Sequence, residues 1–178
     1  KITEQNLVIA INDTKVYDGT PLVTDYNSSA VTVTGLRLDA TLTAGVVTTP
    51  SKDVATYTDD MGTNITTAFA TSDGIDNYNV SYDFTQEITK RDLVIVINDT
   101  KVYDGTPLVT DYTEATAAAL QNGATLTAGV VTTPSKDVDT YTDNTGTNIT
   151  IVFTTSDGIE NYNVSYDFTQ KITSKPIS

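Results

Sequence analysis

Apolar and polar side chains alternate along much of this chain, and alternation is the pattern of a β-strand with one buried face. In the longest run, Tyr78–Ile88, every second side chain from Tyr78 onward is apolar except Gln86, and the opposite face is polar. The same run returns at Tyr162–Ile172. Shorter alternating runs lie at 7–11, 65–69 and 149–153, the last carrying Ile149, Ile151 and Phe153 on one face. Gly, Pro, Ser and Asp cluster between the runs, which predicts turns and an all-β fold.

The chain also repeats itself. Leu7–Tyr26 returns as Leu93–Tyr112 with one difference, Ala10 against Val96, and Ala40–Val54 returns unchanged as Ala124–Val138. A fixed period indicates an array of homologous units. A unit of about 85 residues is larger than a solenoid repeat and can bury a core of its own. The sequence therefore predicts two tandem domains rather than a continuous solenoid.

The repeat also predicts the domain boundaries. Residues 1–89 form repeat unit one, residues 90–173 form repeat unit two, and residues 174–178 start a following unit or a linker. The strands that flank the junction leave only Lys90–Asp92 between the units, and so short a connection favours domains arranged end to end. The expected fold is all-β, with at most one short helix per unit, in two β-sandwich or β-grasp-like domains. Because the chain starts and stops within the pattern, we expect it to be part of a longer protein.

One segment differs between the two copies. Asn27–Asp39 in the first copy corresponds to Thr113–Gly123 in the second, and the two differ in length and composition. The second version has an N-capping Thr113, an Ala- and Leu-rich middle and a Gly just past the end, which predicts a short helix. The first version alternates Val and Thr before Gly35 and favours a short strand or an irregular turn. Such divergence is typical of a surface segment.

Composition excludes several function classes. The chain has 10 basic and 23 acidic residues and a net charge of −13, which argues against binding to nucleic acid or to anionic lipid. It has no His and no Cys, so most nucleophile–base pairs and transition-metal sites are ruled out, and we expect no enzyme activity. The longest apolar run, Leu93–Ile97, is too short to cross a bilayer, so membrane insertion is not expected.

Calcium is the one cofactor that the sequence suggests. Asp73 and Asp76 lie in the loop sequence SDGIDN, and unit two has Asp157 and Glu160 in the equivalent loop. Carboxylate oxygens are the ligands that calcium prefers. The spacing is not that of the known twelve-residue calcium loop, and an ordinary turn capped by Asp and Asn is the alternative.

An internal covalent cross-link is a second candidate. An isopeptide bond joins a Lys amine to an Asn amide beside a buried carboxylic acid, and the first and last strands are useful places for it. The candidate set in unit one is Lys15, Asn77 and Asp18. The set in unit two is Lys101, Asn161 and Asp104. An ester version would join a Thr to Gln86, although Gln86 is more simply interpreted as a hydrogen-bonded residue at the rim of the core.

Three short motifs recur in order in each unit. In unit one they are Lys15–Leu22 (KVYDGTPL), Asp53–Tyr57 (DVATY) and Asp76–Val80 (DNYNV). In the first motif Tyr17 is expected to pack inward with its hydroxyl at the rim, Asp18 to cap a turn, and Gly19 to take a positive φ.

The ordered trio resembles the YDG/MBG-type (mostly-β) tandem repeat domains of bacterial cell-surface adhesins. That family usually has a Gly where this chain has Ala55 and Asp139, which affects only the expected local turn. The resemblance implies a secreted, wall-attached protein whose repeats form a stalk between a ligand-binding head and an anchor. It implies an extracellular location at the bacterial cell surface, with neighbouring repeats as the main partners. The spacer role in turn predicts a monomer. The alternative is a repeated low-affinity binding module for a host glycan or protein.

Overall fold

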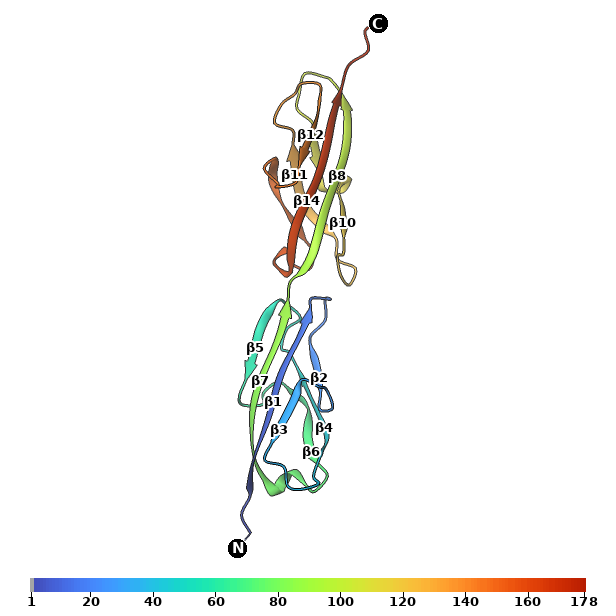
Figure 1. Cartoon of the computed structure of the whole chain (residues 1–178). Coiled ribbons are helices and arrows are strands. Elements are labelled where there is room, and N and C mark those ends of the chain that lie inside the picture. The colour runs from blue at the N-terminus through green and yellow to red at the C-terminus, as the bar shows by residue number, and fades with distance from the viewer. Residues whose placement is uncertain (1) are drawn as a thin grey trace. The chain divides into compact units, whose positions relative to one another are not determined.

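The structure, a computed structural model, describes residues 2–178 and consists almost entirely of β-strands and turns (Figure 1). Contacts divide the chain into two compact units, the first ending at Thr89 and the second starting at Lys90. Each unit holds one four-stranded and one three-stranded sheet. The all-β fold predicted from the alternation is therefore confirmed.

The strands of unit one are arranged in two sheets. The larger has the order β3-β1-β7-β5, from β1 (Gln5–Val16), β3 (Val31–Thr34), β5 (Ala55–Asp59) and β7 (Tyr78–Thr89). The smaller has the order β2-β4-β6, from β2 (Val23–Asp25), β4 (Leu42–Thr48) and β6 (Ile65–Thr71). A single 3-10 turn, η1 (Ile75–Asn77), precedes β7.

Unit two repeats this arrangement. Its larger sheet has the order β10-β8-β14-β12, from β8 (Arg91–Val102), β10 (Thr116–Ala118), β12 (Asp139–Asp143) and β14 (Tyr162–Thr173). Its smaller sheet has the order β13-β11-β9, from β9 (Val109–Asp111), β11 (Leu126–Thr132) and β13 (Ile149–Thr155). The 3-10 turns are η2 (Tyr112–Glu114) and η3 (Ile159–Asn161).

The first and last strands of each unit are the longest, and they are parallel neighbours in the middle of the larger sheet. In unit one all 12 residues of β1 pair with β7, from Gln5 opposite Tyr78 to Val16 opposite Thr89. Figure 1 shows β1 and β7 side by side over their length. β8 and β14 pair in the same way. The other strand pairs are antiparallel.

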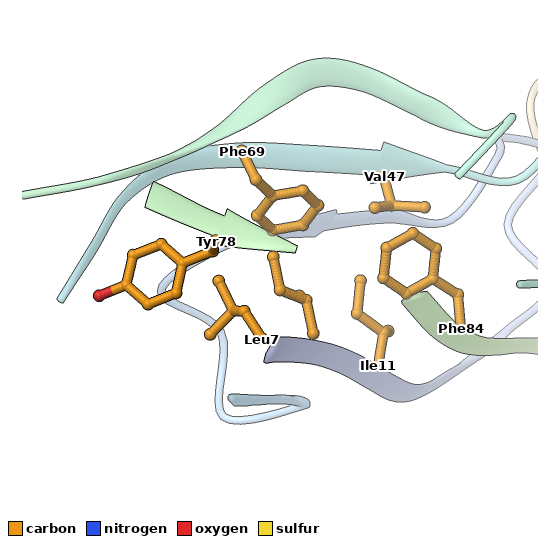
Figure 2. Packing of buried hydrophobic residues seen from close by; sticks show 7 residues of the cluster. Leu7, Ile11, Val47, Phe69, Tyr78 and Phe84 are labelled. Carbon is orange, nitrogen blue, oxygen red and sulfur yellow. The ribbon is translucent and has the colours of Figure 1, made fainter. Parts of the chain in front are cut away.

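The core of unit one lies between its two sheets. Leu7, Ile9 and Ile11 point inward from β1 and are at most 2% exposed. They meet Val47 of the facing sheet and aromatic rings from β6 and β7 (Figure 2). The rings of Phe69 and Phe84 lie 6.0 Å apart, centroid to centroid, across the layers. Two sheets closed over one apolar layer form a β-sandwich, so the sandwich is the correct one of the two predicted folds.

The helix predicted over Thr113–Gly123 is wrong. Only the 3-10 turn η2 forms there, with the Asp111 carboxylate accepting a hydrogen bond from the N–H of Thr113 at 3.1 Å. β10 follows and pairs with β8, and Ala119 and Asn122 then take positive φ values of 81° and 53°, which end any helical path. Pairing satisfies the backbone groups at the edge of β8. This gain outweighs the intrinsic helix propensity of alanine, which is the highest of any residue but amounts to only a fraction of a kcal/mol per residue. In unit one the short-strand alternative is correct, as β3.

Two smaller expectations also need correction. β8 begins at Arg91, so Lys90 alone lies outside the two flanking strands, and the three-residue joint is wrong. Ile151 does not share the buried face of its strand but is 54% exposed. The reason is a β-bulge. Ala128 and Val130, two residues apart in β11, pair with Thr154 and Ile151, which are three residues apart in β13. The extra residue shifts the alternation and turns Ile151 outward.

Candidate functional site

The Tyr-Asp-Gly turn gathers charged and polar groups around Lys15. The Lys15 Nζ atom lies 2.7 Å from Asp18 Oδ1, 2.8 Å from Thr20 Oγ1 and 2.9 Å from the carbonyl oxygen of Pro21. Asp18 Oδ1 also accepts the backbone N–H of Thr20 at 2.9 Å. The ammonium therefore closes the turn by binding three oxygens.

This arrangement sets the pKa of Asp18. Partial desolvation opposes ionisation, but hydrogen bonds from Lys15 and Thr20 outweigh it and lower the pKa of Asp18 to about 2. In unit two the hydrogen bond from Lys101 is the main cause that lowers the pKa of Asp104. Both carboxylates are ionised at neutral pH, so neither can serve as the protonated acid that an isopeptide bond requires.

The rest of the Tyr-Asp-Gly motif agrees with its predicted structural role. The Tyr17 side chain is completely buried, and its hydroxyl accepts a hydrogen bond from Lys52 Nζ at 3.2 Å. Gly19 has φ 80°, as the turn requires. The motif thus anchors the end of β1 to the core.

The predicted isopeptide bond is wrong, because Asp18 lies beside Lys15 but Asn77 does not. Lys15 pairs with Ile88 near one end of the β1–β7 ladder, whereas Asn77 directly precedes Tyr78 at the other end. Tyr78 pairs with Gln5, and ten residues along β1 separate Gln5 from Lys15. That separation is roughly 33 Å at about 3.3 Å per residue. Unit two places Lys101 and Asn161 at opposite ends of the β8–β14 ladder in the same way.

The SDGIDN loop closes on the aromatic ring that starts β7. The Tyr78 hydroxyl donates to Asp73 Oδ2 at 2.7 Å, and Asn77 Nδ2 donates to the Asp73 carbonyl at 2.7 Å. The hydrogen bond from Tyr78 is the main cause that lowers the pKa of Asp73. Asp76 lies in η1. In unit two, Tyr162 donates to Asp157 Oδ2 at 2.6 Å, and Glu160 lies in η3.

Calcium binding by these loops stays a prediction. Across residues 2–178, His, Cys, Asp and Glu form no group of three or more that could hold a metal ion. The alternative of an ordinary capped turn, in which Asp73 accepts the tyrosine hydroxyl, predicts that calcium leaves stability unchanged. Thermal melts in calcium and in chelator test this, with Asp76→Asn/Glu160→Gln as the matched variant. A calcium-dependent rise in the midpoint that this variant abolishes would establish the site.

A third cluster is buried between the layers, and of its members sequence reasoning singled out only Gln86. Gln86 Nε2 donates to Thr24 Oγ1 at 2.8 Å, and the Thr24 hydroxyl donates to Asp13 Oδ2 at 2.7 Å. Gln86 and Thr24 are each 1% exposed. Gln86 is therefore not a rim residue but the centre of a polar chain that joins β7, β2 and β1.

The topology explains the cluster. Asp13 is the ladder partner of Gln86 in the larger sheet, and Thr24 pairs with Val47 in the smaller sheet. Gln86 Nε2 also donates to the Val47 carbonyl at 3.3 Å. The one sequence signal was an amide on the apolar face of an alternating strand, since a buried amide needs partners.

A scan of protein-family models, a search of curated proteins and a search of solved structures found no match to this chain. The resemblance to YDG/MBG-type repeats therefore stays a prediction that rests on the three motifs.

Proposed function

We propose that these units are spacer repeats in the stalk of a secreted, wall-attached bacterial adhesin, and that each unit transmits tension along the chain. The observation that carries the proposal is the parallel pairing of the first and last strands in each unit. The surface location and the adhesin context rest on the motif resemblance.

Parallel terminal strands suit a unit that is pulled from its ends. The chain runs into unit one along β1 and out along β7, so its two ends leave the unit at opposite ends of the same ladder. Tension between them slides β1 against β7 and stresses the ladder hydrogen bonds together. In a parallel pair these bonds are evenly spaced along the strands. Twelve paired residues must therefore yield nearly at once.

The repetition of this design fits the same role. Unit two has the same sheet orders, the same ladder and the same turn clusters as unit one. The two units differ mainly in one surface segment, 27–39 in unit one and 113–123 in unit two. Units this similar are suited to uniform spacing and not to a binding site found in one unit alone. No helix within residues 2–178 has the length and apolar character to cross a membrane.

Small-angle scattering tests the spacer role. A 12-residue strand is about 40 Å long at about 3.3 Å per residue, so two units in series should give a largest dimension of roughly 80 Å. We expect an elongated monomer of that size. A fragment ending at Lys90 provides the single-unit reference. A two-unit particle no longer than this reference would contradict the proposal.

The binding-module alternative stays a prediction. It requires a ligand that both units recognise, and the divergent segments at 27–39 and 113–123 offer no common surface for one. A glycan array and a panel of host matrix proteins, probed with this chain alone, test it. Reproducible binding that each unit retains separately would favour this alternative over the spacer.

A further inference from the structure

The buried chain of Asp13, Thr24 and Gln86 places a hydroxyl, an amide and a carboxylate in the order that acyl transfer needs. The hydroxyl oxygen of Thr24 lies 2.8 Å from Nε2 of Gln86 and 2.7 Å from Oδ2 of Asp13. A hydroxyl becomes a nucleophile when an adjacent base takes its proton. Asp13 is positioned as that base, and Gln86 carries the acyl group.

We propose that Thr24 and Gln86 are the partners of an intramolecular ester bond. Thr24 Oγ1 attacks Cδ of Gln86 as Asp13 takes the hydroxyl proton. The Cδ–Nε2 bond then breaks, and the nitrogen leaves with that proton as ammonia. The products are one Oγ1–Cδ ester and one ammonia, so atoms balance without any oxidant or co-reactant.

The surroundings favour this step. The amide nitrogen faces the hydroxyl, and rotation about the Cγ–Cδ bond of Gln86, a torsion with a broad energy profile, turns the face of the amide carbonyl toward the same oxygen. The carbonyl oxygens of Leu22 and Val47 lie 3.5 Å and 3.3 Å from Nε2, where they hold the nitrogen. Ammonia released to solvent becomes ammonium and is diluted, which draws the exchange toward the ester.

Burial also protects the product. Thr24 and Gln86 are each 1% exposed, so water has little access to the ester carbonyl. An ester at this place would therefore persist in the folded protein and hydrolyse only when the unit opens.

Unit two repeats the constellation. Gln170 Nε2 donates to Thr110 Oγ1 at 2.6 Å, and the Thr110 hydroxyl donates to Asp99 Oδ2 at 2.8 Å. Thr110 and Gln170 are again 1% exposed. Each unit thus carries one site, and we expect one bond per unit.

The bond would tie β2 to β7 across the two layers. Residues 25–85 would then lie outside the path of tension from β1 to β7, which suits a stalk. The inference rests on the side-chain geometry and not on the proposed function, so its failure would leave the spacer role untouched.

Intact mass of the whole chain tests the proposal. We expect a mass lower than the sequence sum by two molecules of ammonia. Thr24→Val should restore one ammonia, and Thr24→Val/Thr110→Val should restore both, whereas Thr24→Ser keeps a hydroxyl and should keep the loss. The single variant leaves unit two as a control within the same molecule.

Peptide mapping locates the bond. Trypsin should yield residues 16–37 joined to residues 53–90, and residues 102–136 joined to residues 137–171, and hydroxylamine should separate each pair because it cleaves esters. A mass equal to the sequence sum would overturn the proposal. So would an ammonia loss that maps to Asn122–Gly123, a sequence that can lose ammonia by forming a succinimide.

Discussion

Replacing Gly129 with Ala is expected to destabilise unit two by about 3 kcal/mol or more, because the added methyl group has no space. A Cβ built on Gly129 would lie 2.2 Å from a ring carbon of Phe153, which is 1% exposed. Gly129 also has φ 143°, a conformation that residues with a side chain rarely adopt. The glycine sits at the β11–β13 bulge, so neither the backbone nor the ring can shift freely.

Gly105→Ala is the matched control. Gly105 lies in the same unit with φ 85°, and an added Cβ there meets nothing within 4 Å. Gly105→Ala should lower the free energy of unfolding through backbone strain alone, by about 1–2 kcal/mol. Hydrogen exchange read by mass spectrometry separates the two units and should show protection lost in unit two while unit one is unchanged. Equal effects of the two substitutions would show that contact with Phe153 is not the cause.

Replacing Asp143 with Ala is expected to cost about 2–3 kcal/mol, because its carboxylate caps a whole turn. Asp143 is 7% exposed and accepts backbone N–H groups from Thr145, Gly146 and Asn148 at 3.0, 2.9 and 2.8 Å. Without the carboxylate these donors lose their partner. Urea denaturation measures the loss, and Asp139→Ala, at an exposed position in the same strand, is the control.

The same carboxylate makes stability depend on pH. Burial raises the pKa of Asp143, but hydrogen bonds from Asn148 and Thr145 outweigh burial and hold the pKa below its ordinary value. Its contribution is therefore complete above the unfolded pKa of about 3.9 and is lost as pH falls through the lower folded pKa. The acid-induced decline in stability should be shallower in Asp143→Asn. An unchanged slope would mean that other groups cause the decline.

The long strands were predictable because their alternation is strong and uninterrupted. Tyr78–Ile88 shows a buried face in the sequence itself, and the structure keeps that face. The face of Ile151 was not predictable, because the bulge that turns it outward depends on how β11 and β13 pair. The helix over Thr113–Gly123 failed for a related reason: pairing with β8 decides the conformation, and composition alone does not reveal that edge.

The candidate site was only partly predictable. Lys15 lies near the end of the first strand and Asn77 precedes the last, and such residues meet only if the two strands are antiparallel. The observed strands are parallel, so these residues lie at opposite ends of the ladder. The same parallel register sets Asp13 opposite Gln86, a pairing that no local pattern indicates. Strand direction was thus the missing information in both cases.

Single-molecule pulling in two directions tests the tension-bearing role of the β1–β7 ladder most directly. The chain has no Cys, so handles can be attached at introduced cysteines alone. Thr3→Cys/Lys90→Cys pulls from opposite ends of the ladder and shears it. Val16→Cys/Lys90→Cys pulls from one end and, with Thr24→Val present in both variants to remove the proposed ester, separates the pairs one after another. The Val16 side chain is 52% exposed, so the substitution spares the core. We predict a rupture force several-fold higher in the shearing direction. Equal rupture forces in the two directions would contradict the account.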